Sequence, residues 1–512
     1  MQKVSESRFE NTMRNSAFAL LSQIFTVVLG FIVRRFFVQE LGAEYLGIST
    51  SFSSILSALS IAELGVGSAI IFSLYKPIAE NDEGKIKSLM QLYRRIYYCI
   101  GTAIFVIGVA LIPFLDFFVK EMPQIEGIIK IYILLVIEHS FGYFFSYKIN
   151  FLTATQQGYI VQRYNILTAV FRAVLQILAL IVLHNYYVYL ILGILCPLIK
   201  DLYATKKVSQ MYPFLRGTAE KLSKHDMKDI STNIGSMFIY KVSQTISTTI
   251  DTLVVSSMIG IVETAIYSNY HLLINYTNLL FNNVFGAITP SIGNLMTVDD
   301  LQKKKDFFSA LQMVYYWVST YLAVGLIVLF NPLIEIWLGP EYLFSQGIVI
   351  ALVVSVTLTN FQRPCALLRD ANGLFKYGKI RPLIMSIINV VAAIVFVKEL
   401  GVIGVVLATC LAKTVTFAWY DPYIVYKHVL KNGLFKYAAN YIFHWAFLGV
   451  LALLCWKIYN IINVSGVLGF LLGVVYITII VNGSFVLVYC KRKNFKYIML
   501  MVKSFLKKIR AR

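Results

Sequence analysis

Long apolar runs follow one another along almost the whole chain, and each is long enough to cross a bilayer as an α-helix. A window of about 20 residues predicts about 14 such helices. Their approximate bounds are 17–38, 45–75, 95–119, 128–152, 159–183, 187–203, 230–258, 265–293, 308–330, 343–367, 381–397, 402–426, 435–459 and 464–489. The pattern predicts an all-α polytopic membrane protein, and the even number of spans places both termini on one side of the membrane.

The run 159–183 carries one arginine, Arg172, near its middle. An arginine at bilayer depth costs about 2.5 to 3.5 kcal/mol, so its side chain is expected to face protein or water rather than lipid. At about 100° per residue, the polar residues of this span lie within about 60° of Asn165. They are Gln162, Asn165, Thr168, Arg172 and Gln176. This stripe is expected either to line a cationic passage or to hold Arg172 in a buried ion pair.

Weak internal repeats divide the chain into two lobes. VQELGAEYLGIS resembles VSSMIGIVETAIYS, and LTATQQGYI resembles LRDANGLFK, each at an offset of about 215 residues. We expect an N-terminal lobe of six spans (1–208), a cytoplasmic linker (209–229), a C-terminal lobe of six spans (230–430) and two appended helices (431–490). The tail 491–512 has the pattern of a basic amphipathic helix on the membrane surface, and 82–95 is expected to form a shorter interfacial helix.

Four other spans carry polar stripes, and the repeat makes them equivalent in pairs. The residues are Gln23, Thr26, Gly30 and Arg34 in the first span; Ser49, Ser53, Ser57, Ser60 and Glu63 in the second; Asn233, Tyr240, Lys241, Gln244, Ser247 and Asp251 in the seventh; and His271, Asn275, Asn278 and Asn282 in the eighth. We expect these stripes to face a central cleft between the lobes. The alternative is that they only join helices, through hydrogen bonds of about 0.6 to 2 kcal/mol each.

Charged and amide side chains in the stripes are the candidate site residues. The candidates for substrate binding are Arg172, Lys241, Arg34, Gln23, Asn165, Gln176, Gln244, His271, Asn275 and Asn278. The candidates for ion coupling are Glu63, Asp251 and Glu138. Each acid could instead neutralise a buried cation, and His271 could be a satisfied core histidine.

Composition and charge agree with a membrane protein and narrow the partners. Of the 512 residues 58% are hydrophobic and 14% are charged, with a formal net charge of +20. The basic residues gather on alternate connections, which by the positive-inside rule makes both termini cytoplasmic. The net charge is thereby explained by topology, and no nucleic-acid partner is expected. The six cysteines form no C-x-x-C pair, and no metal or cofactor site is expected.

The stretch NTMRNSAFALLSQIFTVVLGFIVRRFFVQELGAEYLGISTSFSSILSALSIAELGVGSAIIFSLYKPIAENDEGKIKSLM resembles the opening of bacterial polysaccharide repeat-unit flippases, which act in O-antigen, capsule or exopolysaccharide assembly. These belong to the multidrug/oligosaccharidyl-lipid/polysaccharide exporter superfamily. LGAEYLGI and AELGVGSAI are its most specific parts. The resemblance implies a two-lobed transporter that moves an undecaprenyl-pyrophosphate-linked oligosaccharide to the outer leaflet of the bacterial cytoplasmic membrane. It also implies a polysaccharide polymerase and glycosyltransferases of the same pathway as partners.

Two other functions are weighed against this one. A cation-coupled multidrug antiporter shares the fold, but its cleft would be dominated by acids, whereas Arg172 is prominent here. A membrane glycosyltransferase or polysaccharide polymerase would need an acidic catalytic motif on a sizeable loop, and neither that nor a P-loop is found. The sequence therefore favours a transporter over an enzyme, with an arginine and lysine that suit a pyrophosphate headgroup.

Overall fold

Most of the described chain is helical. The computed structural model describes residues 2–63, 65–217, 219–220, 222–286, 300–378, 380–462, 464–496 and 498–499. Within these ranges all regular secondary structure is α- or 3₁₀-helix. The prediction of an all-α fold is confirmed. The helices belong to two compact units, Met1–Ala265 and Ile266–Arg512.

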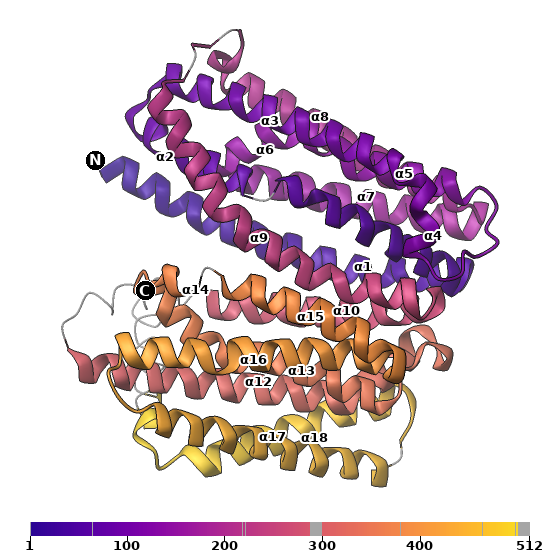
Figure 1. Cartoon of the computed structure of the whole chain (residues 1–512), viewed down its shortest axis with the longest axis vertical. Helices are drawn as coiled ribbons and strands as arrows, with labels where there is room; N and C mark the ends of the chain where they lie inside the picture. Colours follow the sequence, from indigo (N-terminus) through magenta and orange to yellow (C-terminus); the bar gives the residue numbers. More distant parts are fainter. Residues whose placement is uncertain are drawn as a thin grey trace. The chain divides into compact units, whose positions relative to one another are not determined.

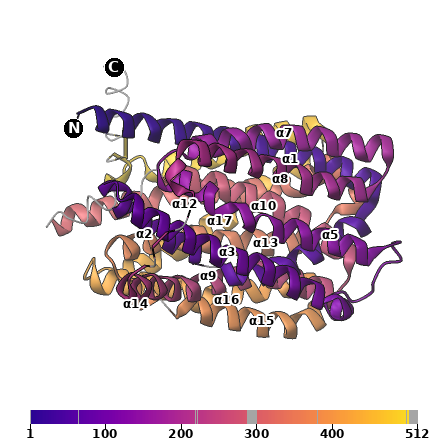
Figure 2. The ribbon, with the colours of Figure 1, turned by 90° about the horizontal axis from the view of Figure 1, so that it is seen from above.

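The first unit is built from helices of very different lengths. They are α1 (Gln2–Leu59), η1 (Ser60–Glu63), α2 (Val66–Glu80), α3 (Glu83–Ala110), η2 (Ile112–Phe114), α4 (Leu115–Phe118), α5 (Ile128–Phe141), α6 (Tyr143–Ala154), α7 (Gly158–Leu183), α8 (Tyr186–Met211), η3 (Pro213–Leu215) and α9 (Lys224–Met258). Helix α7 packs along both α1 and α8 (Figure 2). Helix α9 packs against α1 and α2.

The second unit has a similar make-up. Helix α10 (Ile261–Gly286) lies mostly within it and is followed by α12 (Leu301–Leu338), η4 (Pro340–Tyr342), α13 (Gln346–Ala371), α14 (Phe375–Gly378), α15 (Arg381–Leu400), α16 (Val402–His428), α17 (Leu434–Ile462) and α18 (Gly466–Tyr489). Helix α16 packs on α15 and α13, while α17 and α18 both pack on α12 (Figure 1).

The two sides of α7 differ sharply in exposure, which explains how Arg172 is oriented. Apolar side chains on one side are half to two-thirds exposed, as a lipid-facing surface requires: Leu167, Phe171, Val174, Leu178 and Val182. The opposite side buries Ala173, Gln176, Ala179 and Leu180. The apolar side chains thus face the lipid, and the polar stripe faces the protein.

Eleven helices in the described ranges are long and apolar enough to span a membrane. They make the chain a multi-pass membrane protein. The difference from the 14 predicted spans has two causes. Ala17–Leu59 counts once among the eleven, although the non-helical backbone of Gly42 (φ 82°, ψ −175°) separates the first predicted span from the second within it. Helices α9 and α10 occupy the seventh and eighth predicted positions and are not among the eleven: the described apolar part of α9 is only Thr249–Met258, and α10 carries a stripe of polar residues.

Three predicted helices differ from those observed. The second predicted span is interrupted at η1 and Gly65, whose positive φ of 98° breaks the helix before α2. The fourth is divided at Gly142 into α5 and α6. The prediction of a separate interfacial helix over 82–95 is wrong: Asp82 caps α3, which continues without a break to Ala110. The tail beyond Met499 lies outside the described residues.

Candidate functional site

Arg172 lies near the middle of α7 and joins it to α5. Its Nη2 donates a hydrogen bond to Oε1 of Glu138 over 3.3 Å, and its Nε donates to Oε1 of Gln176 over 3.3 Å. The Arg172 and Glu138 side chains remain 34% and 25% exposed. Among the described residues, these bonds use only part of the five donors of a guanidinium. The arginine is thus oriented by protein groups without being enclosed by them.

Gln176 fixes this arrangement from the buried side. Its side chain is 3% exposed, and its Nε2 donates to the backbone carbonyl of Tyr189, on α8, over 3.1 Å. The glycine at 193 lets α8 come close. A Cβ there would lie 3.3 Å from Glu138 Oε1 and 3.4 Å from Arg172 Nη2. Three helices therefore converge on one guanidinium.

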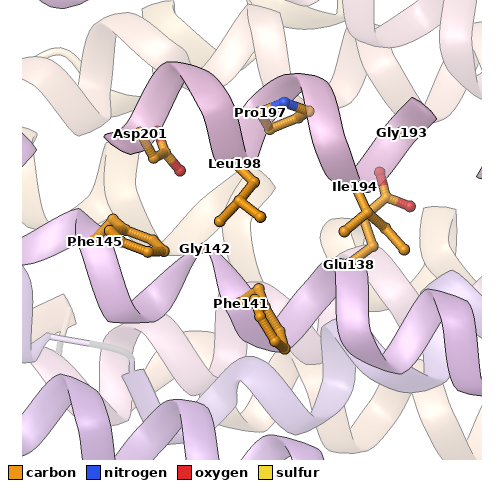
Figure 3. A pocket seen from close by; sticks show the side chains of 9 residues that line it. All are labelled: Glu138, Phe141, Gly142, Phe145, Gly193, Ile194, Pro197, Leu198 and Asp201. Atoms are coloured by element: carbon orange, nitrogen blue, oxygen red, sulfur yellow. The ribbon is translucent and has the colours of Figure 1, made fainter. Parts of the chain in front are cut away.

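A cavity of about 190 Å³ adjoins the Glu138 side of this group. Figure 3 shows it between α5 and α6 on one side and α8 on the other, with the Glu138 and Asp201 carboxylates toward its two ends. It is lined by Glu138, Phe141, Gly142, Phe145, Gly193, Ile194, Pro197, Leu198 and Asp201. The helix break at Gly142 and the proline inside α8 both lie on its walls. The cavity is thus largely apolar, with an acid toward each end.

The other end of the α7 stripe meets a second charged pair. Lys200 Nζ lies 3.1 Å from Oδ1 of the buried Asp201 and donates to Oδ1 of Asn165 over 3.3 Å. Asn165 in turn donates to Oε1 of Gln162 over 3.4 Å. The structure therefore brings the predicted stripe together with Lys200 and Asp201, two residues that the sequence interpretation missed. The signal was available, because a Lys-Asp pair ends an apolar run.

Arg34, on α1, belongs to the same neighbourhood. Arg34, Arg172 and Glu138 all act electrostatically on the Tyr189 hydroxyl. Gln23, on the same helix, is half-buried. Asp251, on α9, is 6% exposed. The charges of two predicted arginines thus both influence one tyrosine of α8.

Glu63 terminates η1 and enters a buried chain of hydroxyls. The Tyr97 hydroxyl donates to Glu63 Oε1 over 2.5 Å, and the Tyr93 hydroxyl donates to that of Tyr97 over 3.3 Å. Asn150 Nδ2 donates to the Tyr93 hydroxyl over 2.8 Å. A Cβ at Gly67 would lie 2.6 Å from the Tyr97 hydroxyl, so a glycine makes room for the chain. Glu63 is therefore hydrogen-bonded rather than paired with a cation in this network.

The predicted residues of the second unit are less closely grouped. The His271 ring lies 4.3 Å from that of Tyr267, and its Nε2 is buried without a hydrogen-bond partner among the described residues. Asn275 is exposed and Asn278 is half-buried. In the first unit, the side chains of Lys241 and Gln244, on α9, lie outside the described residues. Only His271 among these predicted residues can be linked to a further charged group.

That charged group is Lys413, which sequence analysis missed. It lies near the middle of α16, and its Nζ donates to the backbone carbonyl and to the hydroxyl of Ser355 on α13, over 2.9 Å each. It acts electrostatically on His271. The signal in the sequence is a lysine inside the apolar run 402–426.

The second unit also contains a fully buried acid. Asp421, on α16, is 0% exposed and contacts Arg369 of α13 at 2.7 Å, together with Arg381 of α15 and Gln362 of α13. The Arg381 guanidinium also lies over the Phe417 ring, 4.1 Å from its centroid. Both arginines lie at the ends of the basic connection between the predicted spans 343–367 and 381–397. Three helix ends are tied together by one carboxylate.

These features define a multi-pass helical membrane protein with mid-span cations held by neighbouring polar groups. Such groups suit recognition of an anionic solute at bilayer depth. The sequence of residues 12–296 matches the family model described as "Polysaccharide biosynthesis protein". The match covers more than half of the chain, so the protein belongs to that family. The search of curated proteins finds no matching sequence.

Solved structures of transporters share the fold of this chain. The lipid II flippase MurJ, in an inward closed conformation, matches with a TM-score of 0.62 at 18% identity, over 92% of this chain and 98% of that one. An inward-facing multidrug resistance MATE family transporter matches with a TM-score of 0.61 at 15% identity, over 80% of this chain and 98% of that one. The Vibrio cholerae MATE transporter VcmN matches with a TM-score of 0.58 at 11% identity, over 84% of this chain and 99% of that one. These likenesses establish the fold alone.

Proposed function

We propose that this protein is a flippase for an undecaprenyl-pyrophosphate-linked oligosaccharide repeat unit, working by alternating access in the bacterial cytoplasmic membrane. The observation that carries the proposal is Arg172: a guanidinium at mid-span that is 34% exposed and is oriented by Gln176 and Glu138. Its product would serve cell-surface polysaccharide assembly, in keeping with the family to which the chain belongs.

The chemistry of the Arg172 site fits a diphosphate better than an uncharged solute. A guanidinium binds phosphate oxygens through two parallel, charge-assisted hydrogen bonds, and such bonds are about twice as strong as neutral ones. Holding Nε on a buried glutamine reduces the rotamer freedom that binding would otherwise remove. Arg172 would therefore contact the pyrophosphate, with Arg34 adding to the positive field.

The remaining predicted residues take supporting roles in this proposal. Lys241 is proposed as a second phosphate contact. Neutral amides suit the donors and acceptors of sugar hydroxyls. They are Gln23, Asn165, Gln176, Gln244, Asn275 and Asn278, with His271 beside them. Glu63, Asp251 and Glu138 are the candidates for coupling transport to an ion.

The setting of the proposal follows from the charge pattern of the sequence. Basic connections place both termini in the cytoplasm, so the substrate would be loaded there and released outside. The partners would be membrane lipids and the polymerase and glycosyltransferases of one polysaccharide pathway. The protein would act as a transporter and not as an enzyme.

A cation-coupled multidrug antiporter is the second candidate, because MATE transporters share this fold. The acids Glu63 and Asp251 in the first unit favour it. The two functions differ in their dependence on Arg172. An organic cation gains nothing from a guanidinium, whereas a pyrophosphate does.

Headgroup translocation in proteoliposomes tests the proposal. The native chain is compared with Arg172→Ala and Arg172→Lys at equal membrane abundance, using a fluorescent undecaprenyl-pyrophosphate-linked sugar. Arg163→Ala is the matched control, since Arg163 is an exposed arginine on the same helix. We expect translocation to fall at least tenfold in Arg172→Ala, partly in Arg172→Lys and not in the control. Full transport by Arg172→Ala would refute the proposed role of this residue.

A further inference from the structure

The Glu138 carboxylate lies between the Arg172 guanidinium and a cavity. On one side its Oε1 accepts the hydrogen bond from Arg172 Nη2. On the other side the residue lines the cavity between α5, α6 and α8. Figure 3 places it toward one end of this cavity, beside Gly193 and Ile194. The carboxylate therefore has space next to it into which it can turn without leaving the protein.

The two bonds of the guanidinium differ in how easily they are exchanged. The Gln176 bond is anchored, because Gln176 is 3% exposed and is itself fixed to the Tyr189 carbonyl. The Glu138 bond is a single contact between side chains that both remain partly exposed. Exposed single-contact ion pairs are weak and are replaced readily by a better anion. A ligand can displace Glu138 while Gln176 keeps the arginine in position.

We propose that Glu138 is a built-in competitor for Arg172, which holds the guanidinium until a diphosphate headgroup displaces it. This inference rests on the proposed function, because it assigns Arg172 to the headgroup. A carboxylate on the arginine lowers its affinity for every anion by the same factor. Weakly bound monoanions, such as the phosphodiesters of ordinary lipids, are then kept off the site, whereas a tightly bound diphosphate still occupies it. Glu138 would thereby set how tightly an anion must bind to Arg172 in order to occupy the site.

The experiment measures binding of inorganic pyrophosphate and of dimethyl phosphate to the purified full-length protein by calorimetry at pH 7.5. The variants are Glu138→Gln, Glu138→Asp, Arg172→Ala and the double variant Glu138→Gln/Arg172→Ala. Asp201→Asn is the matched control, because Asp201 lines the same cavity but is paired with Lys200. Thermal unfolding of each variant accompanies the binding measurement.

We expect Glu138→Gln to bind pyrophosphate about two- to fivefold more tightly, the gain that loss of a partly exposed ion pair allows. Glu138→Asp should give a smaller gain, because its carboxylate is withdrawn by one methylene, and it serves in place of the glutamine form if that does not fold. Dimethyl phosphate should gain by the same factor as pyrophosphate. Asp201→Asn should gain nothing, and the gain should vanish in the Arg172→Ala background.

Two results would overturn different claims. Unchanged or weaker pyrophosphate binding by both Glu138 variants, with Arg172→Ala still impaired, would make Glu138 a positioning residue and refute its role as competitor. Equal pyrophosphate binding by the native chain and Arg172→Ala would remove the headgroup contact on which the proposed function depends.

Discussion

The Arg172 site of the first unit and the Asp421 cluster of the second unit use the same residue types in opposite ways. Arg172 and Glu138 meet through one contact of 3.3 Å, at 34% and 25% exposure. Asp421 is 0% exposed and is shared by Arg369 and Arg381, each 9% exposed. The first arrangement can exchange partners with little loss. The second cannot, because removing one member leaves buried charges uncompensated. Exposure, rather than residue type, separates a candidate binding group from a structural clamp.

The largest predicted effect is on the Asp421 cluster. Asp421→Ala should lower the free energy of unfolding by about 3 to 5 kcal/mol, since two buried arginines lose their shared counter-ion. Thermal unfolding in detergent measures the loss. Asp370→Ala is the control: Asp370 also binds Arg369, at 2.8 Å, but its side chain is 44% exposed. That change should cost at most about 1 kcal/mol. Equal losses would remove the distinction drawn above.

Breaking the buried chain of hydroxyls at Glu63 should lower the free energy of unfolding by an amount between those expected for Asp421→Ala and Asp370→Ala. Tyr97→Phe removes the hydroxyl that donates to Glu63 over 2.5 Å and accepts from Tyr93. Hydrogen bonds to charged groups contribute about 1.5 to 3 kcal/mol, and we expect a loss of stability in that range. Tyr98→Phe is a suitable control, because it removes one tyrosine hydroxyl from the same helix. The ring of Tyr98 packs on Phe144. If both variants unfold alike, Glu63 is not held by Tyr97.

Arg172→Ala should have a small effect on stability. The lost pair with Glu138 is partly exposed, so we expect a cost of about 1 kcal/mol or less. Pyrophosphate binding should nevertheless fall by at least tenfold. Unfolding temperature and ligand affinity are therefore measured side by side for both variants. Arg172→Ala should change mainly the affinity, and Asp421→Ala mainly the unfolding temperature. A large destabilisation by Arg172→Ala would assign Arg172 to the same structural class as the Asp421 cluster.

The smallest effect is expected at Asp300, the acid at the start of α12. Asp300 caps α12, and the backbone N–H of Lys303 chiefly holds the pKa of its carboxyl below the ordinary value of 3.8. A lowered pKa means that the cap stabilises the folded state above pH 3.8 and loses this contribution as the pH falls further. Hydrogen exchange at the start of α12 should therefore quicken below pH 3.8 in the native chain. In Asp300→Asn it should not change with pH beyond the intrinsic rate.

The sequence by itself determined the class of protein. Apolar runs of spanning length, separated by basic connections, leave a chain no soluble alternative. The helical stripe also determined that Arg172, Gln176 and Asn165 face the same way, since 100° per residue is a property of the helix and not of its neighbours. Both conclusions depend on local periodicity alone.

Only the tertiary structure decided which partners these side chains have. Glu138 precedes Arg172 by 34 positions and Arg369 precedes Asp421 by 52, and no pattern along the chain indicates that they meet. The breaks at Gly65 and Gly142 were equally hidden within apolar runs. Pairing across helices depends on the packing of α5, α7 and α8, or of α13, α15 and α16. That packing leaves Arg172 partly exposed and buries Asp421 completely.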